Sequence, residues 1–88
     1  MEKGVIVYSS VSVVHRARKL LKRLGFQTQV VQLPSDLGLK GCNYGMECFW
    51  TDLEDILQYS KQNKLKVKAV FRVGETESGR VYTAYDLS

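Results

Sequence analysis

The fold is decided by the stretch "KGVIVYSSVSVVHRARKLLKRLG", Lys3 to Gly25, in which an apolar strand runs directly into an amphipathic helix. Residues 5–8 are apolar at both parities, which is typical of a central strand that is buried on both faces of a sheet. From residue 13 onward, apolar side chains recur at helical spacing. Ser10 or Ser12 can cap the start of this helix, and Gly25 can close its end. The stretch therefore predicts a β-α unit whose strand lies inside the sheet.

The remaining segments extend this unit to the order β-α-β-β-α-β. "FQTQVVQL" predicts a second strand that Pro34 ends, and "YGMECFW" predicts a third. "TDLEDILQYSKQN" predicts a second helix, which Thr51 and Glu54 can start as a capping box. "KVKAVFRV" alternates as a half-exposed strand does, and "RVYTAYDL" predicts a fifth strand that pairs back in a hairpin.

We therefore expect a single α+β domain over residues 1–88 with the ferredoxin-like arrangement, in which two helices cover one face of an antiparallel sheet. Residues 74–88 are expected to form a C-terminal hairpin extension with the extra strand. The second sheet face carries no helix in this arrangement, and Tyr8, Tyr44 and Tyr82 are candidates to line it. Because an uncovered apolar face usually marks an interface, we expect a homodimer.

Composition and charge narrow the classes of partner. The chain is 44% hydrophobic with a net charge of +4, and no apolar run approaches the roughly 18 residues of a membrane span. Without a leader segment either, we expect a cytoplasmic protein with no membrane contact. Basic residues cluster in "HRARKLLKR" and "KQNKLKVK", which can attract nucleic acid or form solvated faces. Since neither the first nor the third strand alternates aromatic and basic residues, we expect no specific nucleic acid as partner.

The unusual residues of the chain gather in "LPSDLGLKGCNYGMECFW", Leu33 to Trp50, which holds both cysteines. Cys48 shares the parity of Met46 inside the third strand and is expected to be a small buried hydrophobe. Cys42 lies in a polar, glycine-bearing loop. On an extended strand the two cysteines are roughly 20 Å apart, so an internal disulfide is not expected. Together with His15 they are too few for a zinc site, and we expect no metal and no cofactor.

The predicted topology gives Cys42 a polar neighbourhood. The first two strands run parallel, so the loop before the third strand returns to the end where the first helix begins. A helix N-terminus and nearby cations such as Lys64 or Lys66 favour a thiolate, which is the reactive form of a thiol. The predicted site is Cys42 as nucleophile, with an anion-binding set formed by Ser9, Ser10, Ser12, Gly41 and Asn43.

The sequence resembles the putative sulfur/selenium carrier protein-like family of small bacterial domains. The resemblance covers about residues 4–73 and rests on "VIVYSSVSVVHRARKLLKRLGF", "VVQLPSDLGLKGC" and "TDLEDILQYSKQNKLKV". The family pattern falls here on Ala17, Lys19, Leu20, Leu21, Pro34 and Cys42. The family places a glycine directly after the cysteine, whereas this chain has Asn43 and Tyr44 before Gly45.

Two functional hypotheses follow. The resemblance implies a carrier without catalysis of its own, in which Cys42 holds sulfur or selenium as a persulfide or selenosulfide. Its partners would then be a donor protein, such as a cysteine desulfurase, and an acceptor protein. The alternative is a non-catalytic binding or homodimerisation module that acts through the open sheet face.

Overall fold

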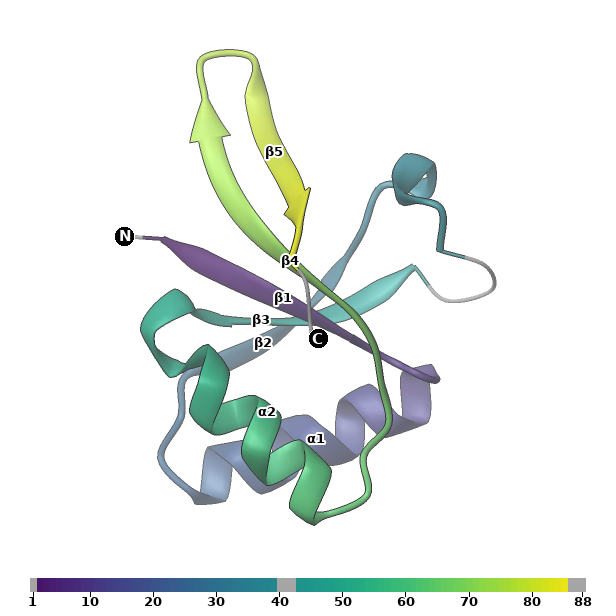
Figure 1. The fold of residues 1–88 in the computed structure, drawn as a ribbon, viewed down its shortest axis with the longest axis vertical. Coiled ribbons are helices and arrows are strands. Elements are labelled where there is room, and N and C mark those ends of the chain that lie inside the picture. Colours follow the sequence, from purple (N-terminus) through teal and green to yellow (C-terminus); the bar gives the residue numbers. More distant parts are fainter. Residues whose placement is uncertain (1, 40–42, 86–88) are drawn as a thin grey trace.

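The structure is a computed structural model that describes residues 2–39 and 43–85. Its elements are β1 (Lys3–Tyr8), α1 (Val11–Arg23), β2 (Thr28–Gln32), the 3₁₀ turn η1 (Ser35–Leu37), β3 (Tyr44–Phe49), the 3₁₀ turn η2 (Trp50–Asp52), α2 (Leu53–Gln62), β4 (Val67–Thr76) and β5 (Gly79–Ala84). The strands form one antiparallel sheet in the order β2-β3-β1-β4-β5. Figure 1 shows α1 and α2 on the same side of this sheet. The predicted α+β class, with two helices and a five-stranded antiparallel sheet, is confirmed.

The central position of β1 follows from its apolar sequence. It pairs with β3 on one side and with β4 on the other, and residues 5–8 are fully buried. Ile6 and Tyr8 face the helices, whereas Val5 and Val7 belong to a second cluster on the opposite face. Both faces of β1 are therefore covered between Val5 and Tyr8, as the apolar residues at both parities predict.

The two helices begin differently. Ser10 caps α1, and its Oγ accepts the N–H of Val13 at 3.3 Å, as predicted. The predicted capping box at the start of α2 is wrong. There the chain first makes the turn η2, and Asp52 stands at the N-cap position without a side-chain cap hydrogen bond. Apolar contacts position this turn, because a Cβ added to Gly4 would lie only 3.0 Å from the ring of Trp50.

The second face of the sheet is not open, which corrects the prediction. It carries a buried cluster against which the segment from β2 into η1 and part of β5 pack: Val5, Val7, Leu33, Phe71 and Val73, with Leu37, Leu39 and Tyr82 against them. Gly45 makes this packing possible. A Cβ at that position would lie 2.5 Å from Val5 Cγ1 and 3.3 Å from Leu33 Cδ1.

The three tyrosines that were candidates for this face differ in position. Tyr8 lies in the core between sheet and helices, where its hydroxyl and the Ser60 hydroxyl are 2.7 Å apart. Tyr44 is 40% exposed, and only Tyr82 packs against the second cluster. The homodimer therefore stays a prediction, but the uncovered face that motivated it is absent from the part of the chain that the structure describes.

Neither α1 nor α2, nor any other helix within residues 2–39 and 43–85, has the length and apolar character needed to cross a bilayer.

Candidate functional site

One edge of the sheet gathers several of the predicted site residues. β1 and β2 are both antiparallel to β3, so their C-terminal ends lie at the edge where β3 begins. Ser9 follows β1 and donates its backbone N–H to the carbonyl of Lys66 at 3.0 Å. At the end of β2, the N–H of Leu33 donates to the carbonyl of Asn43. The same edge therefore holds Ser9, Asn43 and the backbone that leads into β4.

The predicted Gly41 and the predicted nucleophile Cys42 lie outside the described residues. The described chain resumes with Asn43, which is only partly buried, and continues into β3. The loop that carries the cysteine therefore joins this edge of the sheet through Asn43.

The serines of the β1–α1 turn have different tasks. Ser10 Oγ is engaged in capping α1 and lies 3.0 Å from Ser12 Oγ. Ser9 and Ser12 are exposed to solvent. Their position allows these two residues to meet a bound group, while Ser10 fixes the start of the helix.

The N-terminus of α1 is electrostatically unusual within this molecule. Its first turn contains no acidic residue, whereas the first turn of α2 carries Glu54 and Asp55. The N-terminal end of a helix holds about half a positive charge from its aligned peptide dipoles. In α2 that charge is met by its own carboxylates, and in α1 it is left to stabilise another negative group nearby.

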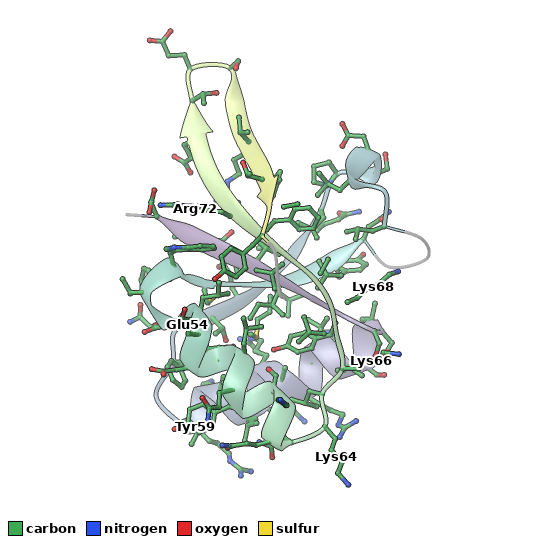
Figure 2. The ribbon with its side chains drawn as sticks, viewed as in Figure 1. Glu54, Tyr59, Lys64, Lys66, Lys68 and Arg72 are labelled. Carbon is green, nitrogen blue, oxygen red and sulfur yellow. The ribbon has the colours of Figure 1, made fainter. Side chains whose placement is uncertain are left out.

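Lysines add positive charge near this edge. Figure 2 shows Lys66 and Lys68 on the side of the molecule where β1 ends and α1 begins, with Lys64 farther along, just beyond α2. All three are exposed. The hydrogen bond between Ser9 and the Lys66 carbonyl ties this lysine-bearing segment to the β1–α1 turn.

Cys48 is unsuited to nucleophilic chemistry. It is a free cysteine, 2% exposed in the main core, as predicted. Burial raises the pKa of its thiol to about 12, and the nearby charge of Asp52 acts in the same direction. At neutral pH the Cys48 thiol is therefore protonated and shielded, and it cannot supply the reactive thiolate form.

The second face of the sheet holds a buried carboxylate that the sequence did not predict. Glu47 is 3% exposed, and its oxygens lie 2.9 Å from Arg80 Nη1 and 3.1 Å from Lys3 Nζ. Gln29 also donates to it, at 3.5 Å. Burial alone would raise the pKa of Glu47, but the hydrogen bonds and charges of Arg80 and Lys3 outweigh it and hold the pKa below its usual value.

Glu47 and its three partners hold strands of the sheet together. The Glu47 carboxylate is ionised and bonded from three other strands, so it ties β1, β2 and β5 to β3. In the sequence, this cluster is indicated only by Glu47, the single charged residue within "YGMECFW". Among the described residues, no group of three or more His, Cys, Asp or Glu side chains is placed to hold a metal ion.

Comparison with known protein families gives a match over most of the chain. A family model described as "Putative Se/S carrier protein-like" matches residues 3–72, which is most of the 88-residue chain. The matched range runs from β1 into β4 and includes the β1–α1 turn and the loop before β3. No curated protein and no solved structure matches the chain.

Proposed function

The chain belongs to the putative Se/S carrier protein-like family, and on that premise we propose that it carries sulfur or selenium on Cys42 as a persulfide or selenosulfide. It receives the atom from a donor protein and passes it to an acceptor protein without catalysing a reaction of its own. The family name is the first support for this proposal, and the chemistry of the described residues is the second.

The observation that carries the proposal is the burial of Cys48, which leaves Cys42 as the thiol proposed to carry sulfur. Cys48 is buried and protonated, so it cannot accept sulfur in the folded protein. Cys42 directly precedes Asn43 in the sequence, and Asn43 lies at the edge where Ser9 and the uncompensated N-terminus of α1 lie. Such an edge favours the thiolate and persulfide anions over their protonated forms.

The transfer step is a thiol exchange at sulfur. The Cys42 thiolate attacks the terminal sulfur of the donor persulfide, a new S–S bond forms, and the donor's own S–S bond breaks. The donor leaves as a thiolate, so no external oxidant or reductant is needed. Discharge is the same step in reverse, with an acceptor thiolate attacking the terminal sulfur on Cys42. Selenium would follow the same exchange.

Sulfur loading of the purified protein tests the proposal. The native protein is incubated with cysteine persulfide, freed of small molecules, and measured by intact mass and peptide mapping. We expect the added mass of one sulfur atom on the peptide that contains Cys42 and none on the peptide that contains Cys48, because only the first thiol is available as a thiolate.

Two matched variants complete this test. Cys42→Ser should abolish loading while the fold is retained, and Cys48→Ser should load like the wild type. Loading that persists in Cys42→Ser, or a wild type that takes up no sulfur, would contradict the carrier function.

The fold subtype, the cellular location, the oligomeric state and the alternative function also stay proposals. The order β2-β3-β1-β4 supports a ferredoxin-like classification, to which β5 adds an edge strand. A cytoplasmic location and a homodimer remain expectations from the sequence. A module acting through an open sheet face has less support, because that face is occupied by the cluster around Val5 and Phe71.

A further inference from the structure

The turn that joins α2 to β4 lies between two grooves. One has a volume of about 430 Å³ and is lined by Leu57, Lys61, Lys64, Leu65, Lys66 and Val67. The other has a volume of about 260 Å³ and is lined by residues of α1 and of the turn: Arg16, Lys19, Leu20, Arg23, Asn63 and Leu65. Leu65 is shared, so the two grooves meet at this buried side chain. We call them together the basic groove.

The basic groove carries unpaired positive charge. Its lining includes six cations and no acid: Arg16, Lys19, Arg23, Lys61, Lys64 and Lys66. Within the part of the chain that the structure describes, none of these six makes an ion pair. By contrast, Lys3, Arg72 and Arg80 each form an ion pair with a glutamate. The basic groove therefore offers charge that an external anion can neutralise.

The walls of the basic groove are apolar between the cations. Leu57 and Val67 are half-buried beside the buried Leu65. No aromatic side chain lines either groove, so there is no platform for stacking a nucleobase. Apolar walls between lysines fit a peptide that presents apolar side chains flanked by carboxylates, which is how an amphipathic helix binds in a groove.

The basic groove also adjoins the edge proposed to carry sulfur. Lys66 lines the groove, and its carbonyl accepts the N–H of Ser9 at the start of α1. Figure 2 shows Lys64 and Lys66 on the same connecting segment, at its two ends. A partner seated on this segment would therefore lie next to the β1–α1 turn.

We propose that the basic groove docks an acidic, amphipathic segment of the protein that donates or accepts sulfur. This inference rests on the proposed carrier function for the identity of the partner, but the binding itself does not depend on Cys42. Opposite charges steer the encounter, and the apolar walls hold the segment once it is seated.

Peptide titration followed by NMR tests the docking. The ¹⁵N-labelled full chain is titrated with a short synthetic helical peptide that has leucine on one face and glutamate at its flanks. We expect amide shifts concentrated at residues 57–67 and at the groove-lining positions of α1, residues 16, 19, 20 and 23. Binding should weaken as salt is added, because exposed charges are screened. The same peptide with glutamine in place of glutamate should bind at least about tenfold more weakly.

Two charge-reversal variants of equal charge change locate the effect. Lys61→Glu/Lys66→Glu alters the basic groove, whereas Arg18→Glu/Lys22→Glu alters exposed positions of α1 that line neither groove. The groove variant should bind at least about tenfold more weakly, and the control should stay within about twofold of the wild type. The amide spectra also report whether each variant is folded.

Three outcomes would overturn the docking proposal. They are absence of binding, equal loss of binding in both variants, and tighter binding of a single-stranded RNA of equal charge at the same residues. Cys42→Ser should bind the peptide like the wild type, because docking does not depend on Cys42. In the wild-type protein, binding without sulfur loading would refute the carrier function alone, and loading without binding would refute the docking surface alone.

Discussion

Gly25 and Lys64 occupy the same position after their helices, although only one of them is suited to it. Their φ angles are +93° and +58°, both in the left-handed region. In both turns the next residue donates its N–H to a helix carbonyl at 2.9 Å, Phe26 to Leu21 and Leu65 to Ser60. This is the Schellman arrangement, in which glycine is preferred because it has no Cβ. Lysine there costs conformational energy that glycine avoids.

Lys64→Gly should therefore stabilise the protein. We expect the free energy of unfolding in urea to rise by about 0.5–1 kcal/mol, since relief of the left-handed strain exceeds the added freedom of the unfolded chain. Lys61→Gly is the matched control, because it makes the same change inside the last turn of α2 and should lose about 0.5–1 kcal/mol. A loss of stability in Lys64→Gly would mean that the lysine side chain makes contacts that outweigh its backbone strain.

One side-chain contact of the β4–β5 hairpin shows that the sheet is curled. Arg80 on β5 reaches Glu47 on β3 at 2.9 Å, although β4 and β1 lie between these strands. In a flat sheet β3 and β5 would be about 14 Å apart, too far for this contact. The sheet must therefore curl, and Figure 1 shows the hairpin rising from the sheet on the side away from the helices.

Removal of the Arg80 contact should loosen this element. In Arg80→Met the buried Glu47 keeps Lys3 but loses its shortest hydrogen bond, and we expect the free energy of unfolding to fall by about 1–3 kcal/mol. Glu75→Gln is the control, because Glu75 is the exposed partner of the same arginine at 3.7 Å and should cost less than about 1 kcal/mol. Amide exchange should accelerate most in β5.

Equal effects of Arg80→Met and Glu75→Gln in urea unfolding would contradict this account. In that case apolar packing alone would hold the hairpin. This packing includes the edge-to-face contact of Phe71 and Tyr82, whose ring centroids are 6.5 Å apart.

At the scale of the whole molecule, sequence periodicity predicted the elements but not the second layer of packing. The order of the elements and the fold class could be predicted from local patterns. These patterns are the apolar residues at both parities of β1, the helical spacing after Ser10 and the glycine at residue 25. The cover of the second face depends on contacts between distant segments. Leu33 can pack over the sheet only because Gly45 leaves room for it, and the hairpin contributes Tyr82 only because the sheet curls.

The candidate site was likewise predicted only in part from the sequence. Topology placed Ser9 and Asn43 at one edge of the sheet, since parallel strands end on the same side. The buried position of Glu47 was not predicted, because its partners come from three other strands and form no local sequence pattern: Lys3, Gln29 and Arg80. The basic groove was visible only as two separate clusters of charge, because their meeting at Leu65 requires α1 to lie beside the end of α2.

The main core contains two buried acids that make the whole fold sensitive to alkali. Burial raises the pKa of Tyr8 from 10.0 to about 12 and that of Cys48 from 9.0 to about 12. The unfolded chain therefore loses these protons at lower pH than the folded protein does. Between about pH 9 and 12 the unfolded state binds fewer protons, so the free energy of unfolding falls as pH rises. Glu47, whose pKa is lowered, acts only in acid, where its contribution is lost as pH falls.

Cys48→Ala should flatten the beginning of this alkaline decline. Its unfolding free energy at neutral pH should be lower than that of the wild type, because a buried sulfur is replaced by a smaller group. Its further loss from about pH 8 to pH 11 should nevertheless be smaller, since only Tyr8 of the two buried acids still titrates differently in the folded and unfolded chains. Urea unfolding at a series of pH values measures both quantities, and Cys42→Ser, which removes the other thiol of the chain, is the control. If Cys48→Ala declined as steeply as the wild type, the fold would not hold the Cys48 thiol protonated, and Cys48 could then supply a thiolate that accepts sulfur.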